Sequence, residues 1–169
     1  MTFQASRHAC PIGTLLLVFD GETLLGLDFD EAPLRLHRLL QRCHGAHDLV
    51  PAATPPAIGD RLDAYFAGQT CDIDSITIRI SGTALQASVW SALRGIAPGN
   101  RESYGTLAAR LGRPTASRAI GHANASNPIS IVIPCHRLVG RTGALVGYAG
   151  GVARKAWLLA HEARHGPGC

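Results

Sequence analysis

The residues best suited to chemistry lie in one short stretch, in which Cys135 follows Pro134 and precedes His136 and Arg137. A proline fixes φ and stops a regular strand, so the cysteine after it is held in one orientation. The thiolate is the nucleophile, and an ordinary thiol is only a few per cent ionised at neutral pH. The imidazole and guanidinium beside Cys135 favour the anion, so this stretch predicts a nucleophilic cysteine. An inert buried cysteine is the alternative.

A nucleophilic cysteine needs a group that takes its proton. The imidazole of a sequence neighbour usually cannot reach the sulfur directly, so we expect His136 to act through a bridging water. A carboxylate on the far ring nitrogen would fix the tautomer and stabilise the imidazolium. Residues 80–169 contain only two acids, Glu102 and Glu162. Glu162 closes an amphipathic C-terminal helix that can pack back onto the core, so Glu162 is the stronger candidate.

Helices must support this stretch. Apolar residues over 84–96 share one helical face. Ser103 can cap a second helix, and after a glycine-containing turn Thr115 can cap a third, which begins at Ala116 and has Arg118 as its long side chain. This spacing is typical of a helix-turn-helix, although an ordinary αα-hairpin has the same spacing. The third helix is otherwise built of small residues, which allow a backbone to approach another surface closely.

The first half of the chain is expected to be a small α+β unit. Two strands are predicted over residues 13–19 and 23–29, around a turn at residues 20–22. Helices are predicted over 31–43 and 57–67, and strict alternation predicts a half-buried third strand over 75–80. The pattern changes near Ser81. We therefore expect an α+β protein with an N-terminal antiparallel-sheet and helix domain over residues 1–82. A mostly helical, winged-helix-like domain would follow over residues 83–169.

The charge distribution changes at the same place. Residues 1–79 carry 6 Arg against 10 Asp and Glu, whereas residues 80–169 carry 9 Arg and one Lys against two Glu. An acidic unit joined to a basic one favours a polyanionic partner, most often nucleic acid. Basic proteins without such a partner also exist.

Other features exclude whole classes of protein. The longest aliphatic runs are far shorter than the ~20 residues of a membrane span. The N-terminus lacks the apolar core of a signal peptide, so we expect a cytoplasmic protein. The pairs His8-x-Cys10 and Cys43-His44 match no zinc pattern, and the chain has no glycine-rich nucleotide loop. We therefore expect neither a metal nor a cofactor.

Several motifs occur in a defined order. Asn127-Pro128 followed by Ile131 to Arg137 is the most specific, and three further stretches accompany it: Gln86 to Leu93, Ser103 to Ala108 and Gly147 to Glu162. These motifs resemble those of the alkylguanine-DNA alkyltransferases, also called methylated-DNA–protein-cysteine methyltransferases. The resemblance covers about 80 residues, and several ordered motifs are far more specific than one.

The resemblance implies a role for each matched residue. Cys135 resembles the residue that takes the alkyl group, and His136 (through a water) and Glu162 resemble the relay that deprotonates it. Tyr104 resembles the phenol that donates to guanine N3 and helps the damaged nucleotide rotate out. Asn127 resembles the hinge between the recognition helix and the active-site loop. The positions of the base pocket are matched by Leu138, Tyr148, Ala149 and Gly150.

The resemblance also implies how DNA is bound. The 6-oxygen substituent of guanine lies inside the base stack, so the nucleotide must be extruded at a cost of a few kcal/mol. Arg118 resembles the finger that fills the gap and offsets part of that cost. The other residues expected to contact DNA are Ser103, Thr115, Ala116, Ser117, Ala119 and Arg137. The partner would be double-stranded DNA with an alkylated guanine, bound by a monomer through the minor groove, where sequence readout is degenerate.

The implied activity is direct-reversal repair. The Cys135 thiolate would displace the alkyl group from the 6-oxygen of guanine, and also from the 4-oxygen of thymine, and the thioether product would make the protein act once. One alternative is a Cys-His hydrolase that pairs Cys135 with His122 or His161, but the hairpin and the charge split would then be unexplained. A non-catalytic damage binder would lack the acceptor cysteine. A transcriptional helix-turn-helix would carry larger polar side chains on its recognition helix.

Overall fold

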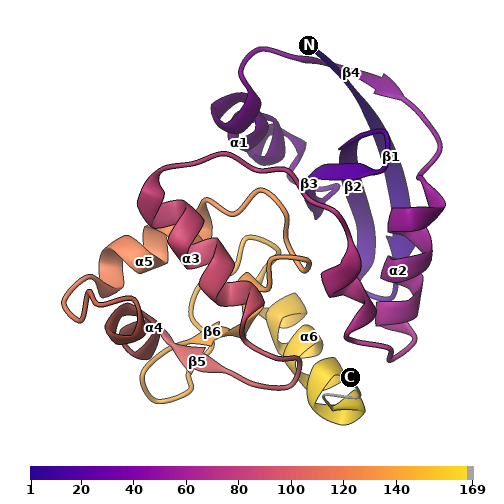
Figure 1. Ribbon diagram of the computed structural model, residues 1–169. Helices are drawn as coiled ribbons and strands as arrows, with labels where there is room; N and C mark the ends of the chain where they lie inside the picture. The colour runs from indigo at the N-terminus through magenta and orange to yellow at the C-terminus, as the bar shows by residue number, and fades with distance from the viewer. Residues whose placement is uncertain (167–169) are drawn as a thin grey trace.

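The computed structural model describes residues 1–166, and its N-terminal part is a four-stranded sheet with two helices. The sheet has the order β3-β2-β1-β4, with antiparallel β1–β2 and β2–β3 pairs and a parallel β1–β4 pair. Figure 1 shows this sheet and α2 on one side of the molecule, with α3, α4 and α5 on the other. The bounds are β1 (Thr2–Cys10), β2 (Gly13–Asp20), β3 (Thr23–Phe29), α1 (Pro33–His44), β4 (Asp48–Pro51) and α2 (Pro56–Phe66).

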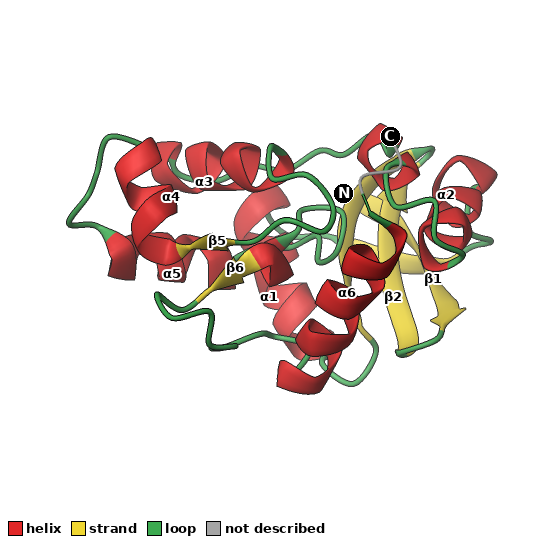
Figure 2. Cartoon of the chain, turned by 90° about the horizontal axis from the view of Figure 1, so that it is seen from below, coloured by secondary structure: helices red, strands yellow, loops and turns green. Residues whose placement is uncertain are grey.

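The C-terminal part is mostly helical, as expected from the sequence. Its elements are α3 (Ala84–Arg94), β5 (Glu102–Ser103), α4 (Tyr104–Arg110), α5 (Ser117–Ala125), the 3-10 turn η2 (Cys135–Arg137), β6 (Leu138–Val139) and α6 (Val152–His165). The α4–α5 hairpin forms one end of the molecule, and β5 pairs in parallel with β6 directly after η2 (Figure 2). The chain segment that contains Cys135 is therefore tied to the start of the hairpin.

Two local expectations were wrong. Residues 75–80 do not form a regular strand. A 3-10 turn, η1 (Asp72–Ser75), leads into a single β-bridge between Ile78 and Leu24 of β3. The edge of β3 cannot pair further with this segment, because Leu27 already pairs with Ile129. Thr115 does not cap α5, since the cap position is Ala116 and no side chain bonds there.

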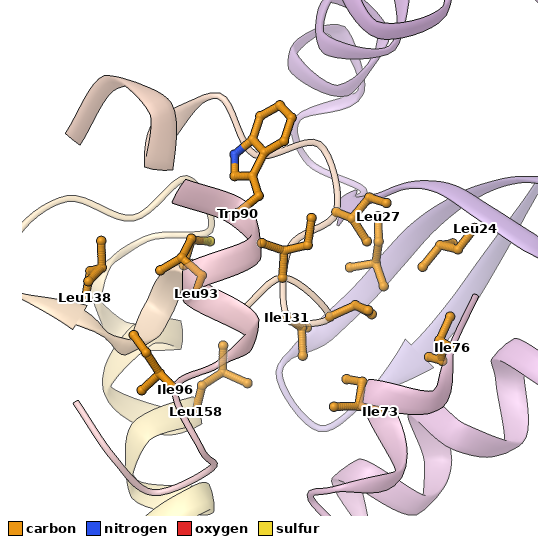
Figure 3. Close-up of a cluster of buried hydrophobic side chains, with 14 of the residues drawn as sticks. Leu24, Leu27, Ile73, Ile76, Trp90, Leu93, Ile96, Ile131, Leu138 and Leu158 are labelled. Atoms are coloured by element: carbon orange, nitrogen blue, oxygen red, sulfur yellow. The ribbon is translucent and has the colours of Figure 1, made fainter. Parts of the chain in front are cut away.

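One hydrophobic core joins the two halves. Figure 3 shows Leu24, Leu27 and Ile73 from the N-terminal half in one cluster with Trp90 and Leu158 from the C-terminal half, and all are buried. The indole Nε1 of Trp90 donates to the carbonyl of Ala123 at 2.9 Å, which fixes α3 against α5. No described helix is long and apolar enough to cross a bilayer.

Candidate active site

Residues 127–134 form the loop that leads to Cys135, and we call this segment the acceptor loop. Asn127 holds it from inside: its Nδ2 donates to the carbonyl of Ile133 at 2.8 Å, and its Oδ1 accepts from the amide of Ile129 at 2.9 Å. Strand β3 holds it from outside, because Leu27 bonds through its amide to Pro128 and through its carbonyl to Ser130. The loop is thus hydrogen-bonded on both sides.

The acceptor loop contains one strained residue. Ile131 has a φ of 72° and is fully buried, a conformation that β-branched side chains rarely adopt. Such strain persists only where the surroundings over-determine the backbone, as the bonds to Asn127 and β3 do here. Cys135 therefore leaves the loop in a fixed direction, as the sequence indicated from Pro134.

Cys135 lies at a cavity of about 320 Å³. The other lining residues come from α1, α4, α5 and the loop before α6: Arg35, Tyr104, Gly121, Asn124, Ala125, Gly147, Tyr148 and Ala149. Cys135 is only 5% exposed, and yet it lines this cavity, which lies beside α5. A volume of this size can hold one purine base.

His136 is hydrogen-bonded to a buried carboxylate. Its Nε2 lies 2.9 Å from Oε1 of Glu162, and both side chains are fully buried. Arg137 donates to both carboxylate oxygens, with two distances of 2.9 Å, and the amide of Gly99 donates to Oε2. Within residues 1–166, Nδ1 of His136 has no hydrogen-bond partner, so it is free to accept a proton through a water.

Burial controls the pKa values of this group. It raises the pKa of the Cys135 thiol, and the hydrogen bond to Asn127 and the charges of Arg35 and Lys155 only partly oppose it. Burial also lowers the pKa of His136, so the imidazole is neutral at neutral pH. For Glu162 burial acts against ionisation, but His136 and Arg137 hold the pKa of the carboxyl well below its usual range. The sequence suggested that nearby cations would favour the thiolate, whereas burial outweighs them, so a proton acceptor is needed.

Tyr104 begins α4 and contributes to the same cavity. Ser103 caps the helix, accepting from the amide of Thr106 at 3.0 Å, which fixes where the tyrosine projects. Burial raises the pKa of Tyr104, and the charge of Cys135 adds to this effect, so the phenol stays protonated and can donate.

The structure contradicts three sequence-based assignments. Arg137 was expected to contact DNA, but it is fully buried, and it bonds to Glu162 and to the carbonyl of Ile96. Leu138 was expected in the base pocket, but its side chain lies in the core. Gly150 contributes no lining either and packs against Phe29, where a Cβ would meet the ring at 2.4 Å.

Five of the predicted DNA-contacting residues, 115–119, lie at the turn between α4 and α5 and at the start of α5, whereas Ser103 precedes α4. Thr115 and Arg118 are exposed, and Arg118 has no ion-pair partner within residues 1–166. The remaining four are half-buried: Ser103, Ala116, Ser117 and Ala119. In the same described range, no group of three or more His, Cys, Asp or Glu is placed to hold a metal ion.

Models of two protein domains match this chain. Residues 84–164 match the DNA-binding domain of 6-O-methylguanine DNA methyltransferase, and residues 6–80 match its ribonuclease-like domain. The chain belongs to the 6-O-methylguanine DNA methyltransferase family. A methylated-DNA–protein-cysteine methyltransferase of Salmonella typhimurium is 47% identical over 92% of this chain and 93% of its own. One of Mycobacterium bovis is 41% identical over 93% of this chain and 90% of its own.

A solved structure gives the same result for the fold. The crystal structure of Mycobacterium tuberculosis OGT in complex with DNA matches with a TM-score of 0.77 and 36% identity, over 99% of this chain and 96% of that one. As a member of the 6-O-methylguanine DNA methyltransferase family, this chain is a DNA-repair methyltransferase with a DNA-binding domain, and it acts by direct reversal of 6-O-methylguanine.

The geometry gives a Cys-His hydrolase no support. His161 bonds to the carbonyl of Tyr65 and stacks on Trp157, and His122 is exposed on α5. Neither belongs to the described residues that line the Cys135 cavity.

Some residues that line the Cys135 cavity were not predicted from the sequence. Because the chain belongs to this family, they are functional candidates. Arg35 pairs with buried Asp28 and donates to the carbonyl of Ala125 at 2.7 Å, so it joins α1 to the end of α5. Its pattern in α1 was that of an ordinary surface arginine. Asn124 is buried, and its Oδ1 has no partner within residues 1–166. The unusual abundance of small and amide residues in α5 was the signal that could have identified it.

Proposed function

We propose that Cys135 takes the methyl group from 6-O-methylguanine in duplex DNA, in one irreversible transfer. Cys135 loses its thiol proton through a water to Nδ1 of His136, and the electron pair stays on sulfur. The sulfur then bonds to the methyl carbon while the carbon–oxygen bond breaks, and the guanine leaves as an anion that a proton from Tyr104 neutralises. The observation that carries this proposal is that Cys135 and Tyr104 line one base-sized cavity, while His136, the residue after Cys135, is hydrogen-bonded to buried Glu162.

The charges of the buried groups support this sequence of steps. His136 is neutral and can accept the proton, and the resulting imidazolium would face the Glu162 carboxylate at 2.9 Å. In a site shielded from water such a pair stabilises charge much more than it would in solvent. The phenol of Tyr104 is protonated and lines the cavity, so it can serve the leaving base.

Nucleotide flipping accounts for the arrangement of the hairpin. Small residues let α5 approach a narrow minor groove, and Arg118 at its exposed start can fill the place of the extruded nucleotide. Affinity would come mainly from phosphate contacts and sequence preference would be weak. The relative from M. tuberculosis has been solved in complex with DNA, which supports a DNA partner here.

Further parts of the proposal rest on the sequence and the family. We infer transfer from the 4-oxygen of thymine as well, a monomer, a cytoplasmic location, and a hinge role for Asn127 between α5 and the acceptor loop. The division into domains at residues 82 and 83 likewise remains a prediction.

The experiment is to mix the protein with duplex DNA that contains 6-O-methylguanine and to weigh its peptides. A gain of one methyl group (about 14 Da) on the Cys135 peptide is expected, limited to one per molecule. Cys10 and Cys43 are also free thiols, and their peptides serve as internal controls. Repeated turnover, or methylation of the control thiols instead, would contradict the proposal.

A further inference from the structure

The N-terminal domain reaches the proton relay through one hydroxyl group. Tyr65, in the last turn of α2, is fully buried and donates to Oε1 of Glu162 at 2.8 Å. The same oxygen accepts from Nε2 of His136 at 2.9 Å. Two residues 97 positions apart are thus joined at the one oxygen that the relay uses.

Packing alone does not require this hydroxyl. The ring of Tyr65 lies edge-on to Phe66, with centroids 5.2 Å apart, and tilted against His161 at 5.4 Å. A phenylalanine would make the same ring contacts. Burial raises the pKa of Tyr65 well above its ordinary value, and the Glu162 charge adds to this, so the hydroxyl is always a donor.

We propose that Tyr65 is a positioning residue of the methyl-transfer site, through which the N-terminal domain sets the proton affinity of His136. This inference rests on the proposed relay from Cys135 to Glu162. The hydroxyl places a partial positive charge at the oxygen that would stabilise the imidazolium. Tyr65 therefore restrains protonation of His136 while it holds the carboxylate in place.

Because Tyr65 and His136 share Oε1 of Glu162, the effect of removing the Tyr65 hydroxyl on His136 has a definite direction. Without the hydroxyl, the Glu162 carboxylate would interact more strongly with His136, and the imidazolium would form more readily. The thiol proton of Cys135 would then move to Nδ1 of His136 at a lower pH, with the electron pair left on sulfur. The carboxylate would not move, because Arg137 still binds both of its oxygens.

Other charged and titratable groups surround Tyr65 and Glu162, and Tyr65→Phe leaves all of them in place. His136 and Arg137 face Glu162 from η2, and His161 of α6 bonds to the Tyr65 carbonyl. Groups that act through their charge alone are Asp74 of η1, Lys155 of α6 and Tyr148. None of them bonds to the Tyr65 hydroxyl within residues 1–166.

The test measures ionisation of Cys135 in the full chain with Tyr65→Phe. Iodoacetamide is applied from about pH 5 to pH 10, a range that spans ordinary His and Cys pKa values, and alkylation of the Cys135 peptide is followed by mass. We expect the midpoint to fall by about half a pH unit, which corresponds to about threefold faster alkylation on the acid side. Glu162→Gln should move the midpoint the other way, because the imidazolium loses its counter-charge.

Phe66→Leu is the matched control. Phe66 packs on Tyr65, Trp157 and His161 and has no polar side-chain atom that could bond to Glu162, so its loss should lower Tm and leave the midpoint unchanged. An unchanged or raised midpoint in Tyr65→Phe, or an equal shift in Phe66→Leu, would overturn the inference. Failure of the proposed function would be visible separately, as wild-type protein whose Cys135 takes no methyl group from DNA.

Discussion

Replacing Glu162 by glutamine should lower the free energy of unfolding far more than removing one charge from a solvent-exposed ion pair would. Glu162 and Arg137 are both fully buried, and the guanidinium donates to both carboxylate oxygens. A glutamine of the same shape leaves one oxygen and adds two N–H donors that face the guanidinium. Arg137 would remain inside the protein as an uncompensated cation.

The magnitude follows from the burial of both partners. Breaking a buried ion pair by removing one partner costs about 3–5 kcal/mol, because the other charge stays desolvated. For a chain of this length that corresponds to a fall in Tm of roughly 6–20 °C. The lowered pKa of Glu162 means that its stabilisation is present above the ordinary Glu pKa of about 4.3 and is lost as pH falls towards the folded-state value. The difference in free energy of unfolding between the wild type and Glu162→Gln should therefore become smaller at acid pH.

Urea unfolding of both proteins, at neutral pH and at about pH 3, measures these differences. Glu102→Gln is the control, because Glu102 is the other acid of the basic half and its partner Arg110 is 47% exposed. Since Arg110 stays solvated when the Glu102 charge is removed, this pair should contribute only ~0–1 kcal/mol. If Glu162→Gln lowered the free energy of unfolding by no more than Glu102→Gln does, the argument from the buried ion pair would be refuted.

Three further changes can be tested. Arg118→Ala should slow transfer from duplex DNA at least about tenfold and leave transfer from free 6-O-methylguanine unchanged, since only the duplex needs a finger; equal slowing would exclude that role. Arg35→Ala should lower the free energy of urea unfolding by about 2 kcal/mol, because buried Asp28 loses its cation, whereas exposed Arg38→Ala should change it by less than ~0.5 kcal/mol. DNA affinity in titrations should fall steeply with added salt; a flat response would contradict binding through phosphates.

Much of the fold could be predicted because its helices have apolar residues at helical spacing and its inner strands β2 and β3 are apolar runs on either side of a turn. The expected helices at 31–43 and 57–67 agree with α1 and α2 to within a residue or two. The missed strands were those without a pattern: β4 is exposed at every position, and β1 alternates only weakly. Residues 75–80 show the opposite error, because strict alternation fits an extended segment whether or not a neighbouring strand is available to pair with it.

The candidate site shows a similar limit. The local sequence around Cys135 predicted an oriented cysteine, and Glu162 could be chosen because only one other acid lies in that half. Arg137 was misjudged, since an arginine after Cys-His in a basic domain also suits a phosphate. Its burial depends on Glu162, 25 positions further on, folding back beside it. No local pattern contains that information.

No member of the proposed relay comes from the acidic half of the chain, and yet this half holds the site at separate points. Leu27 of β3 bonds to the acceptor loop, Arg35 of α1 binds the end of α5, and Tyr65 of α2 binds Glu162. A thiol that burial keeps protonated reacts only if its relay and its cavity keep their mutual geometry. The strain at Ile131 requires support of the same kind. A C-terminal domain without these contacts would retain every residue of the relay and lack the constraints that align them.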